Sequence, residues 1–328
     1  MIDGFGRKID YLRISVTDRC NFRCHYCMPE NQRFLPHKEL LDYSEIALLA
    51  NRFIAHGICK IRLTGGEPLV RRDIDVLIRA LGKHVHAGRL DELTLTTNGS
   101  RLADHASMLA ESGVRRINVS MDSLKPGRFR EITRGGDLAQ VLDGIKAAGK
   151  HNITIKINMV ALKNQNDDEV IDMAEYCAAY GHDLTIIETM PLGEGVSGRQ
   201  DRYVALEEFV APLRQAFDFE NIAHRSSGPA RYWQVGTLGL RLGLITPMSH
   251  NFCDDCNRLR LTTDGKIFMC LGSEMHVDFK QALREDGLDA VDRLLQKALR
   301  LKPERHDFER QMAEPKLRLS RHMNATGG

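Results

Sequence analysis

Between residues 9 and about 189, short apolar runs alternate with longer stretches of helical periodicity, and this alternation constrains the fold more than any other feature. The pattern is typical of repeated βα units. Parallel strands need crossover connections, which helices supply, so we predict an α/β protein with a parallel sheet. Six strands are expected: Tyr11 to Val16, Lys60 to Thr64, Leu93 to Thr97, Arg116 to Ser120, Thr154 to Val160 and Leu184 to Glu188.

Helices are expected between these strands. The first should run from Ser44 to His56, with Ser44 as its N-cap, because apolar residues recur there at helical spacing. Those residues are Ile46, Leu49, Ala50 and Phe53. Similar stretches begin near Arg72, Ala103, Leu138 and Asp168. Periodicity does not distinguish a barrel from an open sheet, but in both folds ligands gather at the carboxyl ends of the strands.

Chemically suggestive residues follow most of the expected strands, and they would share one rim of the sheet. They are the cysteine loop at residues 20–27, Gly65-Gly66-Glu67-Pro68, Asn98-Gly99, Asp122-Ser123 and Met190-Pro191-Leu192-Gly193. Beyond them we expect a loop at residues 193–198, a helix near Leu206 to Phe217 and then short β-like pieces. A boundary near residue 220 would divide the chain into domains at residues 1–220 and 221–328.

Charge and hydropathy exclude some classes of function. The formal net charge is +2, and no run of five or six like charges occurs, so neither nucleic acid nor an anionic membrane surface is an expected partner. The first residues contain no apolar stretch suited to a signal peptide, and no segment reaches the length of a membrane span. A cytoplasmic protein is expected.

Six of the eight cysteines lie in two tight groups. This distribution indicates metal ligands in a reducing compartment, in contrast to a disulfide framework. The other two, Cys59 and Cys177, are expected to be small core residues.

The first group is Cys20, Cys24 and Cys27. A structural zinc site is normally closed by four ligands, whereas a four-iron cluster held by three cysteines leaves one iron open to a small molecule. The sequence therefore indicates an open iron-sulfur site. A zinc knuckle that borrows His25 or His37 is the alternative.

The spacing of these cysteines, with aromatic Tyr26 before the last one, resembles the CxxxCxφC signature of radical S-adenosylmethionine (radical SAM) enzymes. Gly65-Gly66-Glu67-Pro68 resembles the family segment that binds the methionine amino group of SAM. The resemblance implies a [4Fe-4S] cluster on the three cysteines. It also implies a SAM site lined by Tyr26, Gly66, Ser120 and Met190.

The second group is Cys253, Cys256 and Cys270, again without an obvious fourth cysteine. A zinc ribbon completed by His250 or His276 is one interpretation, and a second iron-sulfur cluster is the other. The following residues, 257–261, alternate as in a strand and would place Arg258 and Arg260 on one face. These arginines would either clamp an anion or lie on a solvated strand face.

Two cysteine triads in this order, the Gly-Gly-Glu-Pro segment, Cys256-Asn-Arg-Leu-Arg260 and the terminal Gly327-Gly328 together resemble the GTP 3′,8-cyclases of molybdenum cofactor biosynthesis. The resemblance extends from Arg7 to Gly328. It implies a radical SAM partial (βα)6 barrel of the TIM type, closed by a smaller C-terminal domain that carries a second [4Fe-4S] cluster. GTP would bind between the clusters, and an external electron donor would supply reducing equivalents.

In this family a 5′-deoxyadenosyl radical removes the ribose 3′ hydrogen of GTP, and the carbon radical attacks purine carbon 8. The product is (8S)-3′,8-cyclo-7,8-dihydroguanosine 5′-triphosphate. By motif, the residues expected to contact GTP are Arg13, Lys60, Arg62, Thr96, Lys156, Arg258, Leu259 and Arg260. The catalytic set would be Cys20, Cys24, Cys27, Arg258 and Arg260.

Lys156 is a charge inside an otherwise apolar strand, so it should be buried, unless the strand lies at a sheet edge and the lysine faces water. Many relatives carry arginine where this chain has Thr185. We expect weaker or rearranged triphosphate anchoring, which a measurement of GTP affinity in Thr185→Arg would test.

The tail contains Arg318, Arg321 and His322 before Gly327-Gly328, and by resemblance it reaches the active site. Two alternatives remain: a peptide-modifying radical SAM enzyme and a zinc-stabilised scaffold. The sequence leaves a homodimer open.

Overall fold

The computed structural model describes residues 1–192, 202–224, 228–314, 319 and 321–327, and the expected loop at 193–198 lies outside them, as do Arg318 and Gly328. Within the described residues, twelve strands form one sheet. Their order is β12-β11-β10-β1-β2-β3-β4-β5-β6-β9-β8-β7.

The centre of the sheet consists of the six predicted parallel strands, and they lie in chain order. Each predicted strand is present, with bounds that differ by no more than one residue. The strands are β1 (Tyr11–Ser15), β2 (Lys60–Thr64), β3 (Glu92–Thr97), β4 (Arg116–Ser120), β5 (Thr154–Val160) and β6 (Asp183–Ile187).

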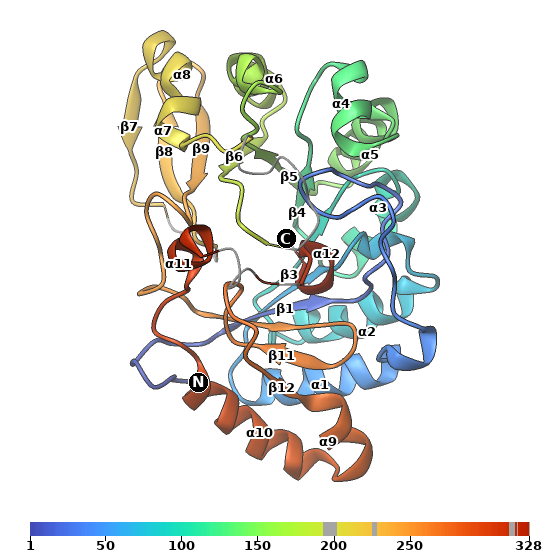
Figure 1. The fold of residues 1–328 in the computed structure, drawn as a ribbon. Coiled ribbons are helices and arrows are strands. Elements are labelled where there is room, and N and C mark those ends of the chain that lie inside the picture. Colours follow the sequence, from blue (N-terminus) through green and yellow to red (C-terminus); the bar gives the residue numbers. More distant parts are fainter. Residues whose placement is uncertain (193–201, 225–227, 315–318, 320, 328) are drawn as a thin grey trace.

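Helices connect these strands and cover one face of the sheet (Figure 1). They are α1 (Tyr43–Ala55), α2 (Ile74–His86), α3 (Leu102–Glu111), α4 (Pro126–Thr133), α5 (Leu138–Lys150) and α6 (Val170–Ala179). The predicted N-cap of the first helix was wrong. Asp42 caps α1 because its carboxylate accepts the backbone N–H of Glu45, whose own carboxylate accepts the N–H of Asp42. Ser44 donates its hydroxyl to Asp42.

The two faces of the sheet differ in chemistry because side chains alternate along each strand. On β1, Leu12 and Ile14 belong to the hydrophobic core beneath the helices, whereas Tyr11 and Arg13 line a cavity on the other face. Lys156 of β5 is buried on that second face, and β5 lies between β4 and β6. The edge-strand interpretation of Lys156 was therefore wrong.

The C-terminal part of the chain extends the sheet at both edges. Strand β9 (Leu240–Ile245) pairs in parallel with β6, and β10 (Arg258–Leu261) pairs in parallel with β1. Ile245 and Arg260, which come from these opposite sides, nevertheless line the same cavity. The sheet therefore curves around this cavity, which makes it a partial barrel.

The remaining elements are strands that extend the sheet outward from these edges, together with helices, of which α12 contacts β1 inside the curve of the sheet (Figure 1). They are α7 (Leu206–Phe209), α8 (Ala211–Ala216), β7 (Phe219–Asn221), β8 (Arg231–Val235), β11 (Lys266–Phe268), β12 (His276–Asp278), α9 (Phe279–Glu285), α10 (Leu288–Leu301), α11 (Phe308–Ala313) and α12 (Met323–Thr326). The single helix predicted near Leu206 to Phe217 is divided at Val210, because Pro212 in the first turn of α8 cannot continue the preceding helix.

The sequence predicted that Cys59 and Cys177 are core residues and that no segment spans a membrane. Cys177 is fully buried in the core as predicted, but Cys59 is partly exposed, so its prediction as a core residue was wrong. In the described part of the chain, no helix combines the length and the apolar character that a bilayer crossing requires.

Candidate active site

Two adjoining cavities occupy the open side of the curved sheet. The first encloses about 1070 Å³ of empty space and the second about 1040 Å³. Asn158, Ile187 and Met190 line both, so the cavities are neighbours.

The first cavity lies at the carboxyl ends of the strands, where the predicted rim residues meet. It brings together Cys20, Cys24 and Cys27 with all four residues predicted for SAM, which are Tyr26, Gly66, Ser120 and Met190. Thr96, predicted to contact GTP, lines this cavity as well. The three cysteines are free thiols. Burial raises the pKa of Cys20 to about 11, so positive charge from bound iron would be needed to stabilise its thiolate.

Gly65 and Gly66 are required by close packing between two loops. A Cβ atom at Gly65 would lie 2.2 Å from the Thr17 carbonyl oxygen, and one at Gly66 would lie 2.2 Å from the Arg19 carbonyl oxygen. Gly66 also donates its N–H to Thr17. The glycines thus hold the cysteine loop against the end of β2, a role that the sequence did not predict.

Two buried carboxylates organise the rim. Glu67 accepts hydrogen bonds from the Thr97 hydroxyl and the Asn98 N–H, and Asp122 accepts hydrogen bonds from the Tyr26 hydroxyl and the Val160 N–H. Burial raises the pKa of Glu67 to about 7 and that of Asp122 to about 6. Through its hydrogen bonds with Tyr26 and Val160, Asp122 connects the cysteine loop to the ends of β4 and β5.

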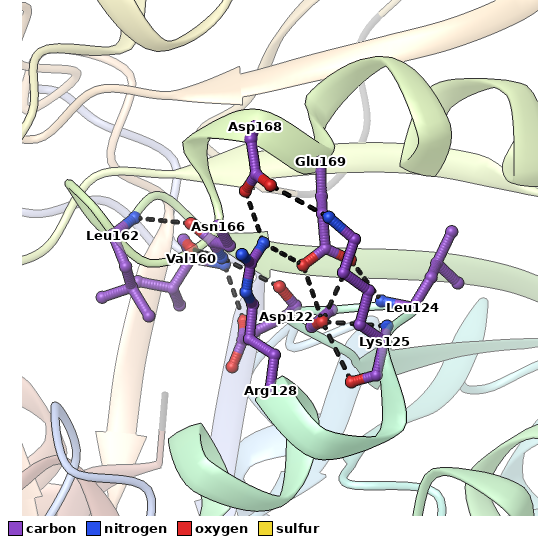
Figure 2. Close-up of polar contacts among 10 residues, drawn as sticks. Asp122, Leu124, Lys125, Arg128, Val160, Leu162, Asn166, Asp168 and Glu169 are labelled. Carbon is purple, nitrogen blue, oxygen red and sulfur yellow. Dashed lines mark hydrogen bonds and ion pairs between the residues drawn. The ribbon is translucent and has the colours of Figure 1, made fainter.

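A third buried carboxylate, Glu169, binds the residues that follow Asp122, as Figure 2 shows. Glu169 is fully buried and accepts hydrogen bonds from the Ser123 hydroxyl and the Leu124 N–H, and it pairs with Arg128 at 2.5 Å. Asn166 donates to the carbonyl oxygens of Asp122 and Val160. The loops after β4 and β5 are therefore fixed to each other.

The second cavity is strongly cationic. Five buried cationic side chains from four strands line it, and all five were predicted to contact GTP: Arg13, Arg62, Lys156, Arg258 and Arg260. Because Arg258 and Arg260 are buried, the alternative that they form a solvated strand face was wrong.

Several of these cationic groups have unsatisfied hydrogen-bond donors. Among the described residues, the buried Nε and Nη2 atoms of Arg13 and the Nε atoms of Arg62 and Arg258 have no acceptor. Burial, and next the nearby Arg260, hold the pKa of Arg13 well below its usual range. Burial, Arg116 and Arg62 lower the pKa of Lys156 to about 7. Buried, unpaired donors that repel each other are suited to a polyanion such as a triphosphate.

Three further residues, two that line this cavity and one that contacts Lys156, were not predicted from the sequence. Tyr232 accepts a hydrogen bond from Lys156 Nζ at 2.5 Å, and Asn118 and Asn158 line the wall. Asn158 follows Lys156 by two residues, and residues two apart in a strand lie on the same face. The sequence could therefore have placed Asn158 beside Lys156 in the cavity wall. Tyr232 comes from β8, and no local pattern indicates that this strand brings a side chain to Lys156.

The second cysteine triad forms part of the same cavity wall. Cys253, Cys256 and Cys270 all line it, together with the arginines of β10. Although burial opposes ionisation, Arg258 and Lys302 lower the pKa of Cys256 to about 6, which favours a thiolate ligand. Among the described residues, no three His, Cys, Asp or Glu side chains are arranged to hold a single metal ion.

Two of the four histidines named in the zinc alternatives, His25 and His276, have other side-chain contacts. His25 is buried, its Nδ1 atom lies 3.1 Å from Arg202, and burial lowers its pKa to about 4. His276 lies beside the Phe268 ring and contacts the Glu274 carbonyl oxygen through Nδ1.

The C-terminal tail enters the barrel, because α12 contacts β1, Met323 lines the first cavity, and α12 lies inside the curve of the sheet in Figure 1. Arg260 donates a hydrogen bond to the Gly327 carbonyl oxygen at 3.0 Å. A Cβ atom at Gly327 would lie 1.5 Å from the Thr64 hydroxyl oxygen. Only glycine therefore fits at this position. Arg321 anchors the preceding segment, because it donates to the Leu271 carbonyl and packs over the Phe268 ring.

Three residues that the sequence analysis connected with GTP, Leu259, Lys60 and Thr185, line neither cavity within the described residues. The Leu259 side chain lies in the hydrophobic core, and within the described residues Leu259 lines neither cavity. Lys60 begins β2 and does not line either cavity within the described residues. Thr185 is fully buried between Asn158 and Gly243 on the adjacent strands, and its hydroxyl oxygen has no partner in the described part of the chain.

Comparisons with known proteins agree with this geometry. The family model described as the radical SAM superfamily matches residues 14–177, and the one described as Molybdenum Cofactor Synthesis C matches residues 182–308. The crystal structure of Streptococcus suis SuiB bound to S-adenosylmethionine is similar, with a TM-score of 0.64 at 15% identity, over 97% of this chain and 77% of that chain. This similarity concerns the fold.

Similarity to sequence relatives is much higher. A GTP 3′,8-cyclase of Rhizobium meliloti (strain 1021) is 52% identical over 100% of this chain and 94% of the relative. A GTP 3′,8-cyclase of Brucella canis is 51% identical over 100% of this chain and 96% of the relative. The chain therefore belongs to the GTP 3′,8-cyclase family of radical SAM enzymes.

Proposed function

We propose that this chain converts GTP, in the presence of SAM and an external reductant, into (8S)-3′,8-cyclo-7,8-dihydroguanosine 5′-triphosphate. The observation that carries the proposal is the convergence of five buried cationic side chains on a cavity lined by one cysteine triad and adjoining the other. Relatives more than 50% identical over the whole chain carry the name of this activity.

The first cavity would hold the radical-generating cofactors. Cys20, Cys24 and Cys27 supply three thiols for a [4Fe-4S] cluster, and the shared wall with Tyr26, Gly66, Ser120 and Met190 leaves room for SAM. When bound, the cluster and SAM supply reductive cleavage of the sulfonium. The protein orients the cysteine loop through Asp122 and Glu67 and shields the site from water.

The second cavity would hold GTP. Arg13, Arg62, Lys156, Arg258 and Arg260 provide charge-assisted donors for the triphosphate. Cys253, Cys256 and Cys270 would hold a second [4Fe-4S] cluster against the base, and Arg260 connects that site to Gly327 of the tail. The two adjoining cavities would place the ribose near the SAM 5′ carbon.

An anaerobic incubation tests the proposal. The reconstituted protein, with about eight irons per chain for two cubane clusters, is mixed with SAM, dithionite and GTP, and the products are identified by mass spectrometry. We expect 5′-deoxyadenosine and the cyclised triphosphate in equal amounts. ATP in place of GTP should give neither. Cyclised product absent from brown, fully loaded protein would contradict the proposal, and equal turnover of a peptide would favour the peptide-modifying class.

A further inference from the structure

Lys302 is a buried charge that neither the motifs nor the proposed substrate contacts use. It is the residue that follows α10, and only 2% of it is exposed. Among the described residues it forms no ion pair with a carboxylate. A buried ammonium group is costly unless it has a negative partner, so its position needs an explanation.

The Lys302 ammonium connects both segments that carry the second triad. It lies 3.2 Å from Cys256 Sγ, 3.1 Å from the Arg258 carbonyl oxygen and 2.7 Å from the Met269 carbonyl oxygen. Met269 directly precedes Cys270. An ammonium group has three N–H donors, and these three contacts use all of them.

Arg7 fixes the segment that carries Lys302. Its guanidinium donates to the carbonyl oxygens of Cys253, Pro303 and Glu304, and it pairs with buried Asp3 at 2.6 Å. Arg7 thus contacts the cysteine loop through backbone atoms alone. Lys302, in contrast, contacts the Cys256 sulfur atom directly.

We propose that Lys302 is a positioning residue for the second cluster, which holds the Cys256 and Cys270 segments together and donates an N–H···S hydrogen bond to the Cys256 ligand. The inference rests on the proposed function, because it requires a cluster on this triad. Hydrogen bonds to cluster sulfurs and nearby positive charge both favour the reduced state of an iron-sulfur cluster. Lys302 therefore raises the reduction potential of the second cluster.

A redox titration monitored by electron paramagnetic resonance tests this inference. The full chain is used in a background where Cys20, Cys24 and Cys27 are replaced by serine, so that any cluster present is the second one. Lys302→Met keeps the length and volume of the side chain without its charge. We expect Lys302→Met to lower the equilibrium constant for reduction at least tenfold, which is about 59 mV for a one-electron couple. Lys302→Arg should restore most of the shift.

Arg7→Met is the matched control, because it removes a buried cation that contacts the same segment without removing a sulfur contact. An unchanged potential in iron-loaded Lys302→Met would overturn the inference. Loss of iron in Lys302→Met but not in Arg7→Met would support it, whereas equal loss in both would reduce Lys302 to a structural role and overturn it. If the background protein itself binds no iron, both the inference and the second cluster of the proposed function fail. If it binds iron while GTP is not converted by the native chain, only the proposed function fails.

Discussion

At the residue scale, the site depends on charged side chains that are buried before a ligand arrives. Lys156 illustrates this, because burial and two arginines lower its pKa to about 7 from an ordinary value of 10.5. In the free protein at pH 8 the amine is mostly neutral. A triphosphate beside it would stabilise the ammonium form and raise its pKa again. Binding of GTP should therefore take up a proton.

This uptake can be measured by calorimetry at pH 8 in buffers of different ionisation enthalpy. We expect up to one proton per GTP bound, and an affinity that falls by up to about tenfold per pH unit above pH 7. Lys156→Met should abolish the uptake. Lys266→Met is the control, because Lys266 is not among the described residues that line the cavity and its Nζ atom pairs with Asp264 at 2.8 Å. This substitution should leave the proton uptake unchanged. Equal uptake in wild type and Lys156→Met would refute this role.

Gly327 is required for a steric reason, because no side chain fits at this position beside Thr64. Its φ is +71°, and a Cβ atom would overlap the Thr64 hydroxyl. Gly327→Ala should displace the tail from Arg260 and lower the rate of cyclisation about 100-fold, while the iron content remains normal. Gly88→Ala is the matched control, because Gly88 has a φ of +66° and nothing lies within 4 Å of its Cβ position. Full activity in Gly327→Ala would show that the tail is not part of the site.

At the scale of elements, the presence and the bounds of the six parallel strands were predictable, because each βα unit is encoded by local periodicity. Their order in the sheet followed only from the family resemblance, because periodicity does not distinguish a barrel from an open sheet. The cysteine triads and Lys156 were predictable because spacing and a charge in an apolar run are local signals. Tyr232 and Lys302 were not. They reach the site from β8 and from the end of α10, and a local pattern does not specify which strand pairs with the edges of the sheet.

The loops after β4 and β5 form one unit around Glu169 (Figure 2). Glu169→Gln should destabilise the protein by about 1–3 kcal/mol, because a fully buried acceptor of several hydrogen bonds loses its charge and its match to Arg128. Chemical unfolding of the apo chain measures this. Asp168→Asn is the control: Asp168 pairs with the same arginine, but its side chain is 54% exposed, so the loss should be about 0–1 kcal/mol. Equal losses would contradict this assignment.

At the scale of the whole molecule, the sheet brings together parts of the chain that are far apart in sequence. The first triad lies on the loop after β1, whereas the second flanks the paired strands β10 and β11, and β10 pairs directly with β1. This pairing places both triads next to adjoining cavities. The account depends on GTP occupying the cationic cavity with its ribose directed toward the SAM cavity.

Transfer of isotope tests that arrangement most directly. GTP deuterated at the ribose 3′ carbon is incubated anaerobically with SAM, reductant and the reconstituted protein, and the 5′-deoxyadenosine is analysed by mass spectrometry. The account predicts one deuterium in 5′-deoxyadenosine and none when the label is at the ribose 2′ carbon. Unlabelled 5′-deoxyadenosine formed together with cyclised product from the 3′-labelled substrate would contradict it.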